Sequence, residues 1–362
     1  MERGHSPIYG KRLSQGRETG GYMAGKASMS SIADKLGISK NTVSLALRGM
    51  PGISDHTRKL IIKTAAELGY QYKAAGKPEE SPGNLCLVIP KSARNSIDFF
   101  SLIQVGVEDE AKKYHMNTLL HYYDENEIEF QTPLCIRERM ISGIITIGRV
   151  SERSVQVLNT YNLPIIMVDH YFDDLEIDCI LTDNHCGGYI VTEHLLVNGH
   201  KKIGFFGDIK ASISFFDRYM GFLKALGNYR IQNEQAFNIF CNYPEATTFE
   251  ETIKSLLELR NGNNLPTAFV CCNDSSAIVL YKLLKQLNIT IPEQVSIVGF
   301  DDIAAASDIM PELTTMQVKK ELMGRKAVLK LMQKLSENDG IPEKLLLSAA
   351  LVERSSVKKL KS

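Results

Sequence analysis

The spacing of apolar residues near the N-terminus predicts short helices separated by turns. A helix over residues 31–36 carries its apolar side chains on one face and ends at Gly37, a residue suited to a sharp break. Ser39 follows as a candidate N-cap, because its hydroxyl can accept a hydrogen bond from a backbone N–H that the helix leaves unpaired. The apolar positions of the second helix recur at helical spacing: Val43, Ala46 and Leu47.

A third helix is predicted after the turn at Pro51-Gly52, with Ser54 as its N-cap. Its apolar stripe consists of Leu60, Ile61, Ala65 and Leu68. Two short helices joined by a tight glycine turn, with a third closing the core, indicate a helix-turn-helix unit. An ordinary helical bundle with a polar surface would give the same pattern.

From residue 85 onward, short apolar runs alternate with amphipathic stretches, as in parallel sheets covered on both faces. The predicted strands of the first half are 85–89, 118–120, 143–147 and 164–168, and the helices are 100–114, 127–140 and 151–161. In the second half the strands are 202–206, 267–272 and 295–300, and the helices are 188–196, 216–226, 249–260 and 275–287. The pattern predicts two doubly wound α/β lobes with a cleft at the carboxyl ends of their strands.

These patterns divide the chain into segments. Residues 1–28 are rich in Gly, Ser and Arg and read as a disordered leader without the apolar stretch of a signal peptide. Residues 29–72 form the helical headpiece and 73–84 a linker. The core spans 85–357: we assign about 85–183 and 316–340 to the first lobe, and about 184–315 and 341–357 to the second.

Charge is distributed unevenly over a chain whose net charge is zero. Residues 1–27 carry a net +3, residues 28–74 carry +4, and the remainder carries −7. A basic headpiece on an acidic body is the electrostatic pattern of a DNA-binding module attached to a domain that does not itself bind DNA.

Composition excludes several classes of protein. No apolar run approaches the roughly 18 residues that a membrane helix needs. The seven cysteines lack CxxC spacing, so we expect reduced thiols in a cytoplasmic protein without cofactor or metal.

Two pairs of neighbouring residues resemble the acid–base pairs of enzymes: Asp169-His170 and Asp301-Asp302. Neither comes with a phosphate-binding glycine loop, a nucleophile elbow or metal-ligand spacing, so an enzyme is disfavoured.

Residues 31–49, followed by Pro51-Gly52-Ile53-Ser54 and residues 66–70, resemble the headpiece of the lactose-repressor-like (LacI/GalR) family almost residue for residue. Short segments of the core also resemble the family, and they occur in the same order along the chain as in the family. Among them are 182–184, 199–203, 273–274 and 295–302. The resemblance covers about 330 residues. It implies a helix-turn-helix headpiece and a two-lobed core like that of periplasmic binding proteins.

The resemblance also implies contacts with DNA. Lys40 and Asn41 stand where the family reads base edges: lysine can donate to guanine, and asparagine can pair with adenine. Leu45 stands where several relatives have Arg or His, so it can only contact apolar groups such as a thymine methyl. Contacts with phosphates are expected from the remaining candidates: Ser31, Ser39, Thr42, Ser44 and Arg48.

For the effector, the resemblance implies Arg218, which precedes Gly221-Phe222, together with Asn273 and Asp301; Asp169 is a fourth candidate. Their donors and acceptors suit the vicinal hydroxyls of a sugar, and a purine or nucleoside fits as well. A structural ion pair across the cleft competes for Arg218, and a helix N-cap role competes for Asp301.

We therefore expect a repressor that binds pseudo-palindromic operator DNA as a homodimer and responds to a small, sugar-like effector, without membrane association. The alternative is a two-lobed solute-binding or sensor protein without regulatory DNA binding.

The linker departs from the family pattern, because it lacks the leucine that wedges into the minor groove. Gly76, Pro78 and Pro82 also oppose a hinge helix. Little minor-groove kinking is expected.

Overall fold

The computed structural model describes residues 28–47, 53–70, 83–95, 97–124, 130–241, 246–336 and 340–360. The chain divides into two compact units, Met1–Ser81 and Pro82–Ser362. The leader up to residue 27, the linker up to residue 82 and Arg48 lie outside the described residues. No helix within the described ranges is long and apolar enough to cross a lipid bilayer.

The N-terminal unit contains α1 (Met29–Leu36), α2 (Lys40–Leu47) and α3 (Asp55–Glu67). Gly37 adopts a left-handed conformation with φ of 65°, and its N–H donates to the Ala33 carbonyl to close α1. Ser28, placed at the end of the leader by the prediction, instead caps α1. The core of this unit consists of Ile32, Ala33, Val43, Ala46, Leu47, Ile61 and Ala65. The predicted helices and the break at Gly37 are confirmed.

The predicted stripe of α3 is wrong at one position. Leu60 is 45% exposed, whereas Ile61 and Ala65 are fully buried. Leu68 packs against the core from the end of the helix. Ser54 caps α3 as predicted, with its hydroxyl accepting from the Thr57 N–H at 3.2 Å.

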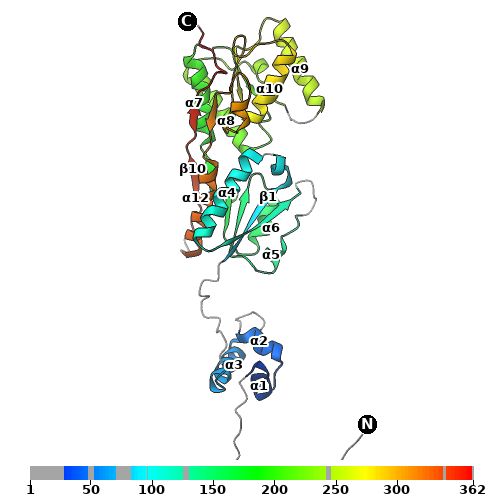
Figure 1. Ribbon diagram of the computed structural model, residues 1–362, viewed down its shortest axis with the longest axis vertical. Helices are drawn as coiled ribbons and strands as arrows, with labels where there is room; N and C mark the ends of the chain where they lie inside the picture. Colours follow the sequence, from blue (N-terminus) through cyan, green and yellow to red (C-terminus); the bar gives the residue numbers. More distant parts are fainter. Residues whose placement is uncertain are drawn as a thin grey trace, which may run out of the picture. The chain divides into compact units, whose positions relative to one another are not determined.

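The first lobe of the C-terminal unit contains a parallel sheet, seen in Figure 1 below the second lobe. Six of the described strands lie in it, in the order β10 (Lys344–Leu347), β5 (Asp178–Thr182), β4 (Ile165–Val168), β3 (Gly143–Ile147), β1 (Asn84–Pro90) and β2 (Asn117–Tyr123). Leu87 pairs with Leu120 of β2 on one side and with Ile145 of β3 on the other. Since helices cover both faces, the central strands are continuous apolar runs.

Alternate residues of β1 show which helices cover each face. Leu85 and Leu87 share a core with α4 (Ile97–Lys113) and α12 (Lys320–Ser336). Cys86 and Val88 share another with α5 (Leu134–Arg137) and α6 (Glu152–Asn159). The helices α4 and α12 approach so closely that a Cβ on Gly324 would lie 2.1 Å from the Ile103 carbonyl oxygen.

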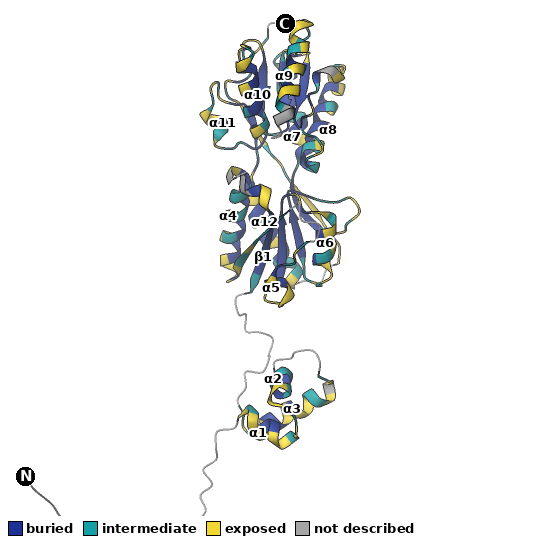
Figure 2. Cartoon of the chain, turned by 90° about the vertical axis from the view of Figure 1, so that its right-hand side faces the viewer, coloured by how far each residue is buried: buried dark blue, intermediate teal, exposed yellow. Residues whose placement is uncertain are grey.

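The second lobe has a parallel sheet in the order β6 (Ile203–Phe206), β7 (Ala268–Cys271) and β8 (Ser296–Val298). Phe205 and Val270 face α7 (Asn184–Val197) and α8 (Ile213–Asn228), whereas Phe206 and Phe269 face α9 (Ala246–Asn261) and α10 (Asp274–Gln286). Figure 2 shows the central strands of both lobes dark blue and buried, with exposed yellow patches on the surrounding helices. The predicted α/β architecture with parallel sheets is confirmed.

The described chain crosses between the lobes at three places: 182–184, 317–320 and 347–350. Short antiparallel strands β9 (Thr315–Gln317) and β11 (Ala350–Val352) pair beside these crossings, with Met316 opposite Leu351. Several adjacent crossings form a hinge about which two lobes can open and close.

Two predicted assignments are wrong. Residues 344–347, assigned to the second lobe, form β10 in the first, because the Asp178 carboxylate accepts from the Glu343 N–H at 2.9 Å and holds this segment beside β5. The helix predicted over 127–140 is reduced to α5, since residues 130–133 are not helical and end in Pro133, while 125–129 lie outside the described part.

Candidate functional sites

The first turn of α2 presents polar side chains to solvent. Ser39 caps the helix, its hydroxyl accepting from the Thr42 N–H at 3.0 Å and lying 2.8 Å from the Thr42 hydroxyl. Ser39, Lys40 and Asn41 are exposed. The first turn contains no acidic side chain, so its N-terminal N–H groups and positive dipole end favour an anion such as a DNA phosphate.

The other headpiece candidates line the outer side of the same two helices. Thr42, Ser44 and Leu45 are half-buried on α2, opposite the fully buried Val43. Ser31 is exposed on α1 and pairs with the Ser28 hydroxyl at 3.0 Å.

Arg58 has a structural contact, because its guanidinium donates to the Ala46 carbonyl at 2.9 Å and ties α3 to the end of α2.

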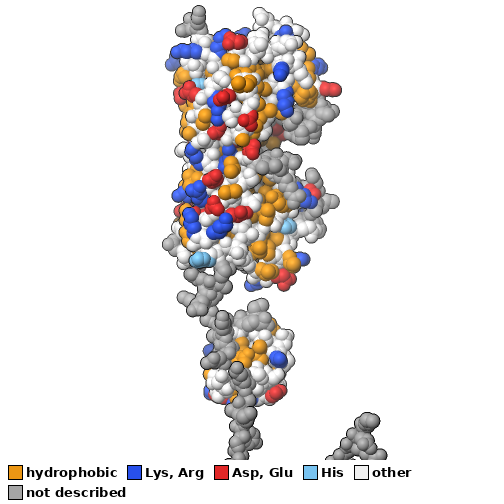
Figure 3. All heavy atoms as spheres, viewed as in Figure 1, with side chains coloured by type: hydrophobic (Ala, Val, Ile, Leu, Met, Phe, Trp, Pro, Cys, Tyr) orange, Lys and Arg blue, Asp and Glu red, His pale blue; other side chains and the backbone are white. Residues whose placement is uncertain are grey.

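The described surface of the core carries charges of both signs: on the face seen in Figure 3, basic and acidic side chains are intermingled. The exposed start of α2 is therefore the better candidate surface for DNA.

The core contains a cavity of about 430 Å³ between its lobes. All four predicted effector residues line it: Asp169, Arg218, Asn273 and Asp301. The first lobe adds Phe99, Phe100, Asp98 and Arg149, and the second adds Ser212, Phe215 and Ser275. Both lobes thus contribute polar groups and aromatic rings to the pocket, a combination found in many small-molecule sites.

Arg218 is the most constrained of these residues. Its guanidinium lies 3.0 Å from the Asp301 carboxylate, donates to the Asn184 side-chain oxygen at 2.8 Å and to the Cys272 carbonyl at 2.7 Å, and lies 3.8 Å from the centre of the Phe300 ring. Only 2% of the residue is exposed. These contacts lie within the second lobe, so the ion pair is not the cross-cleft pair considered from the sequence.

Two buried carboxylates flank this arginine. Burial raises the pKa of Asp169 to about 7, opposed by the nearby charge of Arg218. Burial also raises the pKa of Asp301, again opposed by Arg218. Ser214 donates to the Asp169 carboxylate at 3.3 Å. The site therefore combines a fixed cation with carboxyl groups that can accept hydrogen bonds or, when protonated, donate them.

The competing N-cap role for Asp301 is wrong: the helix that follows, α11 (Ala305–Asp308), has Ala304 at its N-cap position. It is Asn273 that caps a helix, with its side-chain oxygen accepting from the Ser276 N–H at 2.9 Å at the start of α10. The neighbouring Asp274, which is fully buried, accepts from the Ile303 N–H at 3.0 Å. This contact fixes the loop that carries Asp301.

Sequence reasoning missed the groups that hold Arg218 in place, chiefly Asn184 and Phe300. Both lie in segments that resemble the family, 182–184 and 295–302. Their spacing in the sequence gives no sign that they contact Arg218 on α8. Besides the Ser214–Asp169 hydrogen bond, further contacts bridge the lobes: Arg149 donates to the Ala211 carbonyl at 3.1 Å, Lys320 donates to the Asp302 carbonyl at 3.0 Å, and the Tyr171 hydroxyl lies 3.5 Å from the Asp217 carboxylate.

Comparison with known proteins places these features in context. Residues 28–72 match the model for bacterial regulatory proteins of the lacI family, and residues 192–357 match a periplasmic binding protein-like domain. The ribose operon repressor of Haemophilus influenzae is 28% identical over 337 residues, covering 92% of this chain and 100% of the relative.

Solved structures show the same architecture. A LacI family transcriptional regulator from Enterococcus faecium with bound ribose is 25% identical, has a TM-score of 0.66, and covers 77% of this chain and 100% of that one. The lac repressor dimer bound to operator and an anti-inducer has a TM-score of 0.64 at 21% identity, covering 92% of this chain and 100% of that one.

Proposed function

This chain is a member of the LacI family of bacterial regulatory proteins, and on that premise we propose a binding role for each of its two units. It is a DNA-binding transcription regulator of the repressor type, not an enzyme. The N-terminal unit binds operator DNA, and the core binds a small effector that controls this binding. Because bacterial DNA lies in the cytoplasm, we infer that compartment for a DNA-binding protein.

In the N-terminal unit, α2 is the proposed recognition helix. Lys40 and Asn41 read base edges, and Leu45 makes an apolar contact in the major groove. Ser31, Ser39, Thr42, Ser44 and Arg48 contact phosphates and set the register. The exposure of Lys40 and Asn41 on a capped helix supports this assignment.

In the core, the proposed effector is a sugar. The observation that carries this proposal is the convergence of four polar side chains on one cavity at the lobe interface: Asp169, Arg218, Asn273 and Asp301. The ribose operon repressor and the ribose-bound regulator among the relatives favour a sugar over a purine. An effector changes DNA affinity only through its different affinity for the open and closed lobes.

A homodimer would place two headpieces about one helical turn apart, roughly 34 Å, on a pseudo-palindromic operator. The dimeric lac repressor supports this arrangement.

The proposal is tested with the full-length protein at one fixed salt concentration, because DNA affinity depends steeply on salt. Selection from randomised duplex DNA should yield a pseudo-palindromic site. D-ribose or another sugar should then change affinity for that site by about five-fold or more. Asn273→Ser, whose hydroxyl can still cap α10, should lose the response and keep the basal DNA affinity. Binding without sequence preference would contradict the headpiece assignment, and indifference to all sugars would contradict the effector class.

A further inference from the structure

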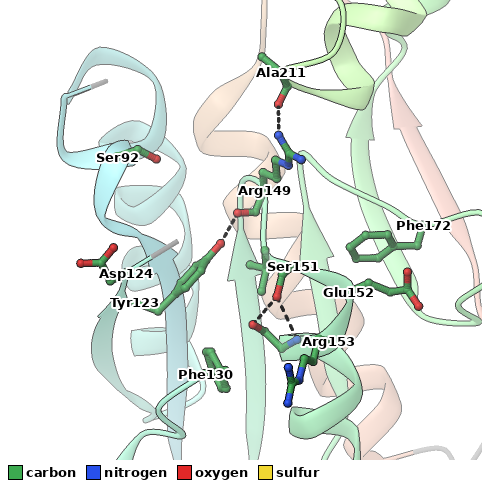
Figure 4. Close-up of a pocket in the computed structure, with 12 residues that line it drawn as sticks. Ser92, Tyr123, Asp124, Phe130, Arg149, Ser151, Glu152, Arg153, Phe172 and Ala211 are labelled. Atoms are coloured by element: carbon green, nitrogen blue, oxygen red, sulfur yellow. Dashed lines mark hydrogen bonds between the residues drawn. The ribbon is translucent and has the colours of Figure 1, made fainter. Parts of the chain in front are cut away.

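A second chamber of about 610 Å³ opens beside the effector cavity on the first lobe (Figure 4). It lies at the carboxyl ends of β2 and β3 and over the start of α6. Ser92, Arg149 and Ala211 line both cavities, so the two spaces meet at these residues. None of the four predicted effector residues lines the second chamber.

Arg149 marks the junction and is held at both ends. The Tyr123 hydroxyl donates to its backbone carbonyl, and its guanidinium donates to the Ala211 carbonyl at 3.1 Å. Figure 4 shows the side chain extending from β3 towards Ala211 of the second lobe. A ligand that extends from the effector cavity into the chamber would therefore pass the Arg149 guanidinium.

The chamber combines aromatic rings with polar groups. Tyr123, Phe130 and Phe172 supply the rings, the first two packed edge to face with centroids 6.0 Å apart. Ser92 also lines the chamber, as does Ser151, whose hydroxyl caps α6 by accepting from the Ser154 N–H at 3.1 Å. A lining of both aromatic and polar side chains suits a pyranose or furanose, which has a C–H face and a polar rim.

The charged groups of the chamber do not converge as a phosphate site requires. Arg149 and Arg153 are balanced in the lining by Asp124 and Glu152, and Lys91 pairs with Asp124 at 3.0 Å. In Figure 4 the guanidinium groups of Arg149 and Arg153 point in opposite directions. The two guanidinium groups are therefore not placed to bind one phosphate together, and the chamber favours an uncharged ligand group.

We propose that this chamber is a second sugar subsite, so that the effector is an uncharged disaccharide with one ring in the Arg218 cavity and the other against Phe172. This inference rests on the proposed sugar-binding function of the first cavity. It adds that the chamber, not the first cavity, sets the preference for ligand length.

The test is calorimetric titration of the full-length protein with D-ribose, D-glucose and D-galactose, then with cellobiose, maltose and lactose, and finally with glucose 6-phosphate. We expect one disaccharide to bind at least about ten-fold more tightly than its component sugars. Phe172→Ala should remove this margin of about ten-fold, roughly the effect of one lost aromatic contact. Asn273→Ser should weaken single-ring and two-ring sugars alike. Phe240→Ala, at an exposed phenylalanine outside both cavities, is the matched control and should change neither.

Four results would overturn the subsite. If single-ring sugars bind as tightly as disaccharides, the effector cavity stands and the chamber plays no part. If glucose 6-phosphate binds more tightly than any disaccharide, the chamber recognises an anion. If no sugar binds, the proposed effector class fails together with the subsite. Equal losses for both ligand lengths in Phe172→Ala would also contradict it.

Discussion

The guanidinium of Arg218 lies 3.0 Å from the carboxylate of Asp301, and both side chains are more than nine-tenths buried. Removing the arginine leaves a buried carboxylate without its cation, which typically costs about 3–5 kcal/mol. We expect Arg218→Ala to lower the free energy of unfolding by about that amount and to abolish the response to sugar. Operator binding should persist below the lowered melting temperature. Urea unfolding and DNA titration measure the two effects.

Arg325→Ala is the matched control for this variant. Arg325 pairs with Glu321 at 3.0 Å on the surface of α12, where an ion pair contributes less than about 1 kcal/mol. Adding Asp301→Asn to Arg218→Ala should recover part of the lost stability, because the buried charge is removed. An equal cost for Arg218→Ala and Arg325→Ala would contradict the buried pair, and a retained sugar response would contradict the effector contact.

Several strands were predictable from the sequence because burial imposes a continuous apolar run, although the equally buried β5 was not predicted. The predicted strand 143–147 has the bounds observed for β3, because all its residues are buried. β10 was missed because it is a four-residue edge strand, mostly exposed, whose position depends on pairing with β5. Its place is fixed by tertiary contacts that leave no periodic pattern in the sequence.

The site was predictable only in part for a related reason. The resemblance pointed to Arg218, Asn273 and Asp301, which line one cavity. The contacts of Asn184 and Phe300 with Arg218 arise where α7, α8 and the loop after β8 meet, and no local spacing encodes that meeting. The second chamber was missed because its aromatic residues come from separate strand ends.

Stability should depend on pH through Asp169. Burial raises the pKa of this carboxyl to about 7 in the folded protein, above the ordinary value of 3.8. Between these values Asp169 binds more proton in the folded state than in the unfolded state, so its contribution to the free energy of unfolding falls as pH rises from about 4 to 7. His170, whose pKa burial lowers to about 4, contributes with the opposite sign. One such group contributes a slope of at most about 1.4 kcal/mol per pH unit. Chemical denaturation at intervals from pH 4.5 to 8 measures it.

Asp169→Asn should flatten that slope, while Asp109→Asn, at an exposed position on α4, should leave it unchanged. Burial also raises the pKa of Asp274 to about 7, so some dependence of the same sign should remain in Asp169→Asn. Identical profiles for the wild type and Asp169→Asn would show that Asp169 titrates in its ordinary range.

The close approach of α4 and α12 makes a prediction with a built-in control. A Cβ at Gly324 would lie 2.1 Å from the Ile103 carbonyl oxygen, so Gly324→Ala must push the helices apart and should destabilise the first lobe by about 1–3 kcal/mol. A Cβ added at Gly227, near the end of α8, would meet no atom within 4 Å, so Gly227→Ala should be neutral or stabilise by up to about 1 kcal/mol. Thermal unfolding of both variants checks this, and equal effects would refute the close packing.

Base recognition is tested at the start of α2. Lys40→Ala and Asn41→Ala should each relax the preference at one or two operator positions and cost about 1–3 kcal/mol on the selected site, with a smaller loss on unrelated DNA. Lys63→Ala, at an exposed lysine on α3, removes the same charge as Lys40→Ala and is the control for non-specific attraction. It should leave the order of preferred sequences unchanged. Repeated selection from randomised duplexes at constant salt distinguishes the cases. If Lys40→Ala and Lys63→Ala weaken binding to all sequences equally, Lys40 acts through its charge and does not read a base; an unaltered preference in Asn41→Ala would remove that residue from base recognition as well.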